Sequence, residues 1–136
     1  MTLKQTVRIP RTLVNDLLHQ AQLSPMREIC GLVGRREDNC ECYPLETQET
    51  DASVLFALNA CEQLAALEAL KARQQQLFAI YHSHPHAPAL PAITDEDVVD
   101  FPDALYLLIS LNTKGVLEMR GFDRQSGKLE EVDLII

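Results

Sequence analysis

Apolar residues near the start of the chain recur with the spacing of an amphipathic helix. Over residues 11–23, one side of such a helix would carry the aliphatic positions Leu13, Leu17, Leu18 and Ala21. Pro25 follows closely and cannot continue a helical hydrogen-bond ladder, so the helix should end before it. The pattern predicts a helix that packs one face against a core.

A second helical pattern covers roughly residues 60–75. Asn59 can act as its N-cap, because a short amide side chain accepts hydrogen bonds from the free amides of the first turn. Its apolar stripe is predicted to comprise Ala60, Cys61, Leu64, Ala66, Leu67 and Leu70. The charged positions Glu62, Glu68, Lys71 and Arg73 are expected to face water, so the stripe belongs to a core and binds no cofactor.

The remaining apolar runs are short and bounded by turn residues, as strands are. Residues 29–34 and 40–45 flank the polar turn RREDN and predict a hairpin. A loop over 46–53 precedes the short run VLFAL, and LFAIY at 77–81 predicts another strand. Three closing strands are expected near 104–111, 116–122 and 129–135, with NTKG and RQSG as turns. This order predicts one α/β (α+β) domain over residues 1–136, a mixed sheet with flanking helices, whose topology the pattern leaves open.

The composition is that of a folded domain, and it limits the kinds of partner to be expected. The 136 residues are 46% hydrophobic and 24% charged, which is ordinary for a globular protein. The net charge is −8, and no run of Lys and Arg is long enough to follow a phosphate backbone, so nucleic acid is not an expected partner. The first ten residues, MTLKQTVRIP, contain no apolar stretch of membrane-spanning or signal-peptide type, so no membrane association and a cytoplasmic location are expected. The oligomeric state stays open.

The four cysteines do not form a metal-binding pattern. Cys40 and Cys42 would share one face of an extended strand, while Cys30 and Cys61 stand alone. A structural zinc site needs two cysteine pairs, or one pair with suitably spaced histidines. Surface or core thiols are therefore the expected reading.

Candidate metal ligands lie after the strand predicted at 77–81. His82 and His84 are two residues apart, so on an extended backbone both imidazoles leave the same face and can meet one ion. The proline-rich segment 85–91 is long enough to fold back, and Asp95 stands at a predicted helix start capped by Thr94. Two imidazoles and one carboxylate suit Zn²⁺ and leave a fourth position open, which is typical of catalytic zinc.

A zinc hydrolase also needs a base, and Glu28 is the candidate. It directly precedes the apolar run ICGLVG, where a carboxylate calls for an explanation. Such a base takes a proton from water and returns it to the leaving amine. The alternative is a surface carboxylate paired with Arg27 or Arg35. Ser83 is not expected to be a nucleophile, because both neighbouring histidines are assigned to metal.

These residues resemble a known family. EICGLVG, followed by YHSHPHAPALPAITD, is similar to the JAMM or MPN metalloisopeptidase pattern: an upstream glutamate, then His-x-His-Pro, and an aspartate after ten intervening residues. The resemblance implies a cytidine-deaminase-like JAMM/MPN fold, a general base at Glu28, and zinc held by His82, His84 and Asp95. It further implies hydrolysis of an amide bond after the C-terminal Gly-Gly of a ubiquitin-like or sulfur-carrier protein.

One departure from the family pattern keeps a second hypothesis open. The family usually has a serine three residues before the aspartate, where its hydroxyl helps to hold the oxyanion, and this chain has Ala92. Loss of one such donor costs about 2.7 to 4 kcal/mol in other enzymes. The alternative is thus a non-catalytic MPN-type metal-binding scaffold. Zinc deaminases are a further rival class, but their His-x-Glu and Pro-Cys-x-x-Cys strings are absent from this sequence.

Overall fold

The computed structural model describes residues 6–23, 29–45, 60–84, 104–110, 118–125 and 128–136. Their elements follow in the order β1 (Thr6–Arg8), α1 (Arg11–Leu23), β2 (Cys30–Arg36), β3 (Asn39–Leu45), α2 (Ala60–Ala72), β4 (Gln76–His84), β5 (Leu105–Ser110), β6 (Glu118–Gln125) and β7 (Lys128–Ile135). Neither helix of these ranges has the length and apolar character needed to cross a membrane.

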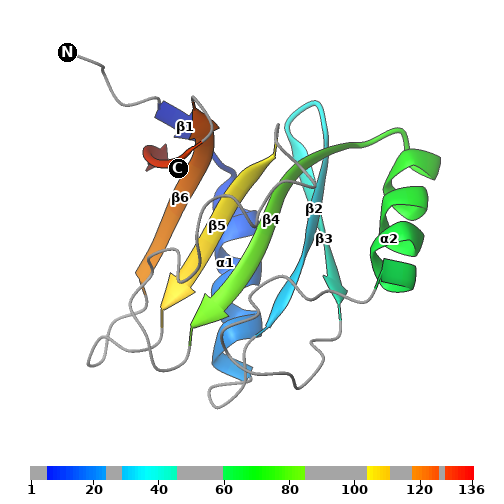
Figure 1. Cartoon of the computed structure of the whole chain (residues 1–136), viewed down its shortest axis with the longest axis horizontal. Coiled ribbons are helices and arrows are strands. Elements are labelled where there is room, and N and C mark those ends of the chain that lie inside the picture. The colour runs from blue at the N-terminus through cyan, green and yellow to red at the C-terminus, as the bar shows by residue number, and fades with distance from the viewer. Residues whose placement is uncertain (1–5, 24–28, 46–59, 85–103, 111–117, 126–127) are drawn as a thin grey trace.

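The strands form one seven-stranded sheet in the order β1-β7-β6-β5-β4-β2-β3. Two neighbouring pairs, β1 with β7 and β4 with β5, are parallel, and the other pairs are antiparallel. Both arrangements occur in one sheet, so the prediction of a mixed sheet with flanking helices is confirmed. The parallel pair β4 and β5 lies at the centre of the sheet and ends at the same edge (Figure 1).

The two faces of the sheet carry separate core clusters. On one face, α1 runs behind the strands in the view of Figure 1 and buries its residues Leu13, Leu17 and Ala21. On the other face, Ala66 of α2 packs with residues from four strands: Leu32, Ile80, Tyr106, Leu108 and Phe122. Strand β4 serves both clusters, because its side chains alternate between the faces: Ala79 and Tyr81 face α1, and Ile80 faces α2.

The first predicted helix is confirmed over residues 11–23, and the second begins at the predicted residue but ends earlier, at Ala72. Gln74 has a φ of 59°, in the left-handed region that ends many helices. The amides of Gln74 and Gln75 donate to the carbonyls of Lys71 and Leu70, each at 2.9 Å. These two bonds form a Schellman cap, so the chain leaves the helix before the predicted end at residue 75.

The predicted apolar stripe of α2 is wrong at Leu64. Ala66 and Leu70 are buried, but Leu64 is 58% exposed. Leu64 lies six residues before Leu70, which puts it about 120° away around a helix with 100° per residue. An apolar residue at that angle cannot share the buried face.

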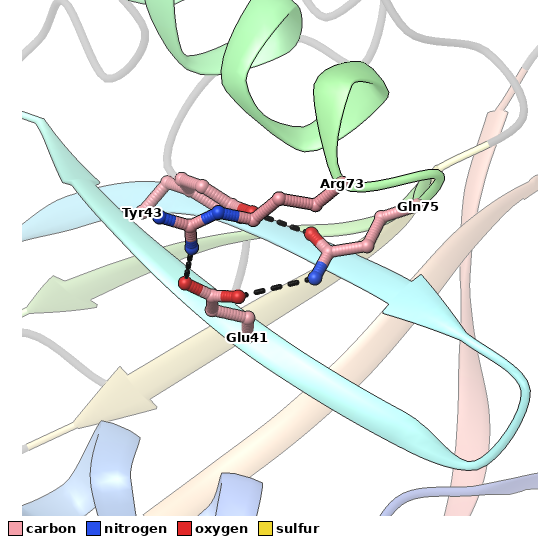
Figure 2. A network of polar contacts seen from close by, with 4 residues as sticks. All are labelled: Glu41, Tyr43, Arg73 and Gln75. Atoms are coloured by element: carbon pink, nitrogen blue, oxygen red, sulfur yellow. Dashed lines mark hydrogen bonds and ion pairs between the residues drawn. The ribbon is translucent and has the colours of Figure 1, made fainter.

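A polar network ties the end of α2 to strand β3 (Figure 2). Arg73 forms an ion pair with Glu41, and its guanidinium lies 5.7 Å from the centre of the Tyr43 ring. Gln75 donates to Glu41 at 3.1 Å and accepts a hydrogen bond from the Tyr43 hydroxyl. Arg73, which the sequence places in water, is indeed exposed, and it also anchors the helix end to the hairpin.

The strands agree with the predicted runs, with shifted ends. The hairpin of β2 and β3 closes around Glu37, whose φ is 55°. The run predicted at 77–81 extends over Gln76–His84, and the closing strands cover Leu105–Ser110, Glu118–Gln125 and Lys128–Ile135. The predicted loop at 46–53, the run at 54–58, the Asn59 cap and the helix start at Thr94 lie outside the described residues.

Candidate active site

The candidate site lies at the sheet edge where β4 and β5 end and β2 begins. The Cα partners of His82 are Cys30 on β2 and Leu108 on β5. His84, the last residue of β4, is paired with Ser110, the last residue of β5. Strand ends that meet in this way place residues from three chain segments at one edge.

His82 is 1% exposed. Since side chains alternate along β4, it shares the face of Ile80, on the α2 side of the sheet. Ser83 and Tyr81 point to the α1 side by the same alternation. Of the sequence-predicted ligands, His82 is thus a buried imidazole at the end of a central strand.

Ser83, between the two histidines, is joined to the segment before β2 by two hydrogen bonds. Its amide donates to the carbonyl of Ile29 at 2.9 Å. Its hydroxyl oxygen accepts from the amide of Ile29 at 2.8 Å, and Ser83 is 0% exposed. Ile29 follows Glu28 in the sequence. The structure therefore places Ile29, which follows the predicted base, in contact with Ser83, which lies between the two predicted histidine ligands.

The structure describes the other predicted site residues only in part. Glu28, Ala92 and Asp95 lie outside the described residues, and His84 is described by its backbone in β4. Within the described ranges, no three His, Cys, Asp or Glu side chains gather as a metal site would require. The four-residue constellation consequently remains a prediction from the sequence.

Sequence reasoning missed two buried serines at this edge. Ser83 was considered only as a nucleophile, although its position inside His-Ser-His was the available sign of a role at the site. Ser110 ends the apolar run LYLLIS, is 0% exposed, and pairs with His84. A single polar residue that closes a fully buried strand could have marked it.

The strands of the candidate site lie within a region that matches a known sequence family. Residues 10–122 match Prok-JAB, the prokaryotic homologs of the JAB domain. The chain belongs to this family. The match includes the strands of the candidate site, and it confirms the resemblance on which the predicted site residues were assigned.

Two relatives of this Prok-JAB domain are named as a peptidase and a desampylase. The CysO-cysteine peptidase of Mycobacterium tuberculosis is 29% identical over 121 residues, which are 88% of this chain and 83% of the peptidase. The desampylase of Haloferax volcanii is 27% identical over 89 residues, which are 63% of this chain. That match spans 64% of the desampylase, slightly less than two thirds of its length.

Solved structures confirm the JAB/MPN fold of the Prok-JAB domain. A protein from Desulfitobacterium hafniense, determined in solution, has a TM-score of 0.73 and 26% identity, with 96% of this chain and 92% of that chain covered. A JAB1/MPN domain protein from Archaeoglobus fulgidus has a TM-score of 0.56 at 15% identity, with 98% and 100% covered. At that identity the second likeness concerns the fold alone.

On the α1 side, Tyr81 and Gly31 support the strands that carry the site. They are Cα partners, and a β-carbon on Gly31 would lie 2.4 Å from the Tyr81 hydroxyl oxygen and 2.6 Å from the Tyr43 carbonyl oxygen. The Tyr81 hydroxyl donates to Gln20 of α1 at 2.8 Å, and burial raises the pKa of Tyr81. The close approach requires glycine at position 31 of the Prok-JAB domain.

The thiols of β3 are partly buried against the core, within the expectation of surface or core thiols. Cys40 and Cys42 both pack against the cluster on the α1 side, which confirms their shared face. Burial raises the pKa of Cys40 despite the nearby Arg35. Burial, with the charge of Asp16 adding to it, raises the pKa of Cys42 to about 11. Such thiols stay protonated near neutral pH and are poor nucleophiles.

Proposed function

We propose that this Prok-JAB domain is a zinc-dependent peptidase that hydrolyses the amide bond after the C-terminal Gly-Gly of a ubiquitin-like or sulfur-carrier protein. In this proposal His82, His84 and Asp95 hold Zn²⁺, and Glu28 is the general base. The observation that carries it is the contact of Ser83 with Ile29, which joins the ligand strand to the residue after Glu28. Family membership and the named activities of the relatives support it.

The described part of the site suits zinc. His82 is a buried imidazole at a strand end, where packing on both sides limits its motion. His84 lies two residues further along β4, on the same face of the strand as His82. At the usual rise of a strand, the two positions are about 6.6 Å apart. Zinc, when bound, would supply Lewis acidity and a water of lowered pKa.

The protein's own groups then account for the proton transfers. Glu28 takes a proton from the attacking water and holds it while the carbonyl carbon becomes tetrahedral. It delivers that proton to the leaving amine as the carbon–nitrogen bond breaks. The products are a carrier with a free C-terminal carboxylate and a protonated amine, which together hold both protons of the water, and Glu28 returns to its ionised form.

The substrate class follows from the relatives and from charge. The relatives named CysO-cysteine peptidase and desampylase support a substrate of the class proposed here. The net charge of −8 favours encounter with a tail or leaving group that presents Lys or Arg. A small carrier with an extended C-terminal tail fits both points.

Ala92 favours a second candidate, a non-catalytic metal-binding scaffold. Where the family usually has an oxyanion-binding serine, this chain offers a methyl group and no donor. On the scaffold hypothesis the wild type binds zinc and cleaves nothing, while Ala92→Ser gains activity. On the peptidase hypothesis the wild type already cleaves, and Ala92→Ser accelerates it by about 10²- to 10³-fold at most.

The test is a cleavage assay with a defined product. The wild type, loaded with one equivalent of zinc, is incubated with a sulfur-carrier protein that is extended beyond its Gly-Gly, and the products are weighed by mass spectrometry. The proposal expects a single cut after Gly-Gly that a chelator abolishes and added zinc restores. A carrier whose final glycine is replaced by proline serves as the control substrate. No cut by the wild type would refute the peptidase, and a cut by Ala92→Ser alone would favour the scaffold.

A further inference from the structure

Ser83 makes a contact that ordinary strand pairing does not provide. The register of β2 and β4 pairs Cys30 with His82, and the ladder ends there on the β2 side. Ile29 and Ser83 would be the next pair, and the bond from the Ser83 amide to the Ile29 carbonyl makes it a hydrogen-bonded pair, in which two backbone bonds are usual. One backbone bond is present, from the Ser83 amide to the Ile29 carbonyl, but the Ile29 amide donates to the Ser83 hydroxyl oxygen. The Ser83 hydroxyl oxygen thus accepts the hydrogen bond that a backbone carbonyl accepts in a regular ladder.

That hydroxyl acts on the peptide group of the predicted base. The amide nitrogen of Ile29 is bonded to the carbonyl carbon of Glu28, so the Ser83 hydroxyl holds the peptide unit that both residues share. Ser83 is itself bonded to His82 and His84. One buried side chain therefore connects the backbone of the base with the backbone of the two imidazoles.

We propose that Ser83 is a positioning residue that fixes the distance between Glu28 and the histidine pair by holding the Ile29 amide. The proposal rests on the proposed function and adds a role that the metal ligands and the base do not fill. Ser83 does not touch the substrate in this role: by strand alternation it faces α1, opposite to His82. Its hydroxyl oxygen accepts a hydrogen bond from the Ile29 amide.

The chemistry explains why a hydroxyl is needed here. Ser83→Ala would leave the part-buried amide of Ile29 without its acceptor, and Ile29 would shift to find another. A shift of about 1 Å in a catalytic group can cost about 10²-fold in rate. Ser83→Thr keeps the oxygen and suits a strand, so it should restore the contact.

Ile109 offers a matched control. It is the Cα partner of Ser83 on β5 and is 0% exposed, in the cluster on the α1 side. Ile109→Val removes a methylene group beside Ser83 but leaves the Ser83 hydroxyl in place. Any effect that comes only from looser packing should appear in Ile109→Val as well.

The first measurement is amide hydrogen exchange at Ile29 by NMR in the metal-free protein, which needs no activity. Ser83→Ala should exchange at least about tenfold faster at Ile29, while the Leu32 amide inside β2 keeps its rate. Ser83→Thr and Ile109→Val should resemble the wild type at Ile29. Equal exchange in Ser83→Ala and the wild type would overturn the proposal.

The second measurement separates this role from the function itself. With zinc loaded and an extended carrier as substrate, Ser83→Ala should lower kcat about 10- to 100-fold at unchanged KM and unchanged zinc content, and Ser83→Thr should recover it. If the wild type cleaves and Ser83→Ala cleaves equally well, the positioning role fails and the peptidase stands. If the wild type binds no zinc and cuts nothing, the peptidase fails and the positioning role fails with it.

Discussion

Gly31 and Tyr81 approach so closely between β2 and β4 that no side chain fits at residue 31. A β-carbon there would lie 2.4 Å from the Tyr81 hydroxyl oxygen, 2.5 Å from its ring carbon and 2.6 Å from the backbone oxygen of Tyr43. Backbone and a buried ring cannot move aside as a flexible side chain can. Gly31, the first glycine of the EICGLVG segment, is thus required for the packing of the strands that carry the site.

The Gly31→Ala variant should accordingly lose stability. We expect a loss of about 1–3 kcal/mol in the free energy of unfolding, as for other overpacked cores. Gly121→Ala is the control, since its new β-carbon would first meet the Cδ2 atom of Leu134, at 2.7 Å, which ends a flexible side chain. Thermal unfolding followed by circular dichroism measures both. Equal melting temperatures for Gly31→Ala and the wild type would contradict the close approach.

Much of the fold could be predicted from the sequence, because single segments suffice to show periodicity. The 11–23 helix begins and ends as predicted, and strands β2 to β7 each overlap a predicted run. The sheet order could not be predicted, because pairing depends on contacts between distant segments. The end of α2 was missed because the residue in the left-handed conformation is Gln74, and not the glycine that usually marks such a helix end in a sequence.

Leu64 and Leu70 give a direct test of how α2 packs. Leu70 is 1% exposed and Leu64 is 58% exposed, although the sequence placed both in one stripe. Leu70→Ala should cost about 2–5 kcal/mol in unfolding free energy. Leu64→Ala should change it by less than about 0.5 kcal/mol, as exposed substitutions do. Urea titrations decide the matter, and equal losses at both positions would mean that α2 is rotated from its described orientation.

Cys42 should make the fold less stable in alkali. Its pKa rises from the ordinary 9.0 to about 11 in the folded protein because burial penalises the thiolate. Below pH 9 both states keep the proton and the stability is complete; between about pH 9 and 11 the unfolded thiol ionises first, so stability falls. Cys42→Ala should flatten this fall in urea titrations at pH 8 and 10.5. An unchanged slope would contradict the shifted pKa.

The candidate site could be predicted in part, for a different reason. His82 and His84 share a strand, so their two-residue spacing alone implied a common face. The role of Ser83 could not be predicted, because its partner Ile29 lies 54 residues away in the sequence and meets it only after the sheet forms. Ser110 was missed for the same reason: it pairs with His84 across a parallel ladder.

Glu28→Gln should separate metal binding from turnover. An amide at residue 28 cannot accept the proton, so hydrolysis should fall by about 10²- to 10⁴-fold, the usual contribution of a general base. The zinc content should stay equal to that of the wild type, because Glu28 is not a proposed ligand. Carrier cleavage and metal analysis of the same preparations provide both values. A Glu28→Gln variant as active as the wild type would remove the base from the mechanism.

Metal analysis of a matched pair of variants tests whether two imidazoles and the Asp95 carboxylate hold one zinc ion. Asp95→Ala removes a proposed ligand, while Asp97→Ala removes a neighbouring carboxylate expected to face solvent. The measurement is zinc per chain after dialysis against metal-free buffer. We expect one zinc in the wild type and in Asp97→Ala and almost none in Asp95→Ala. Equal zinc in both variants would rule out Asp95 as a ligand, and no zinc in the wild type would rule out the site.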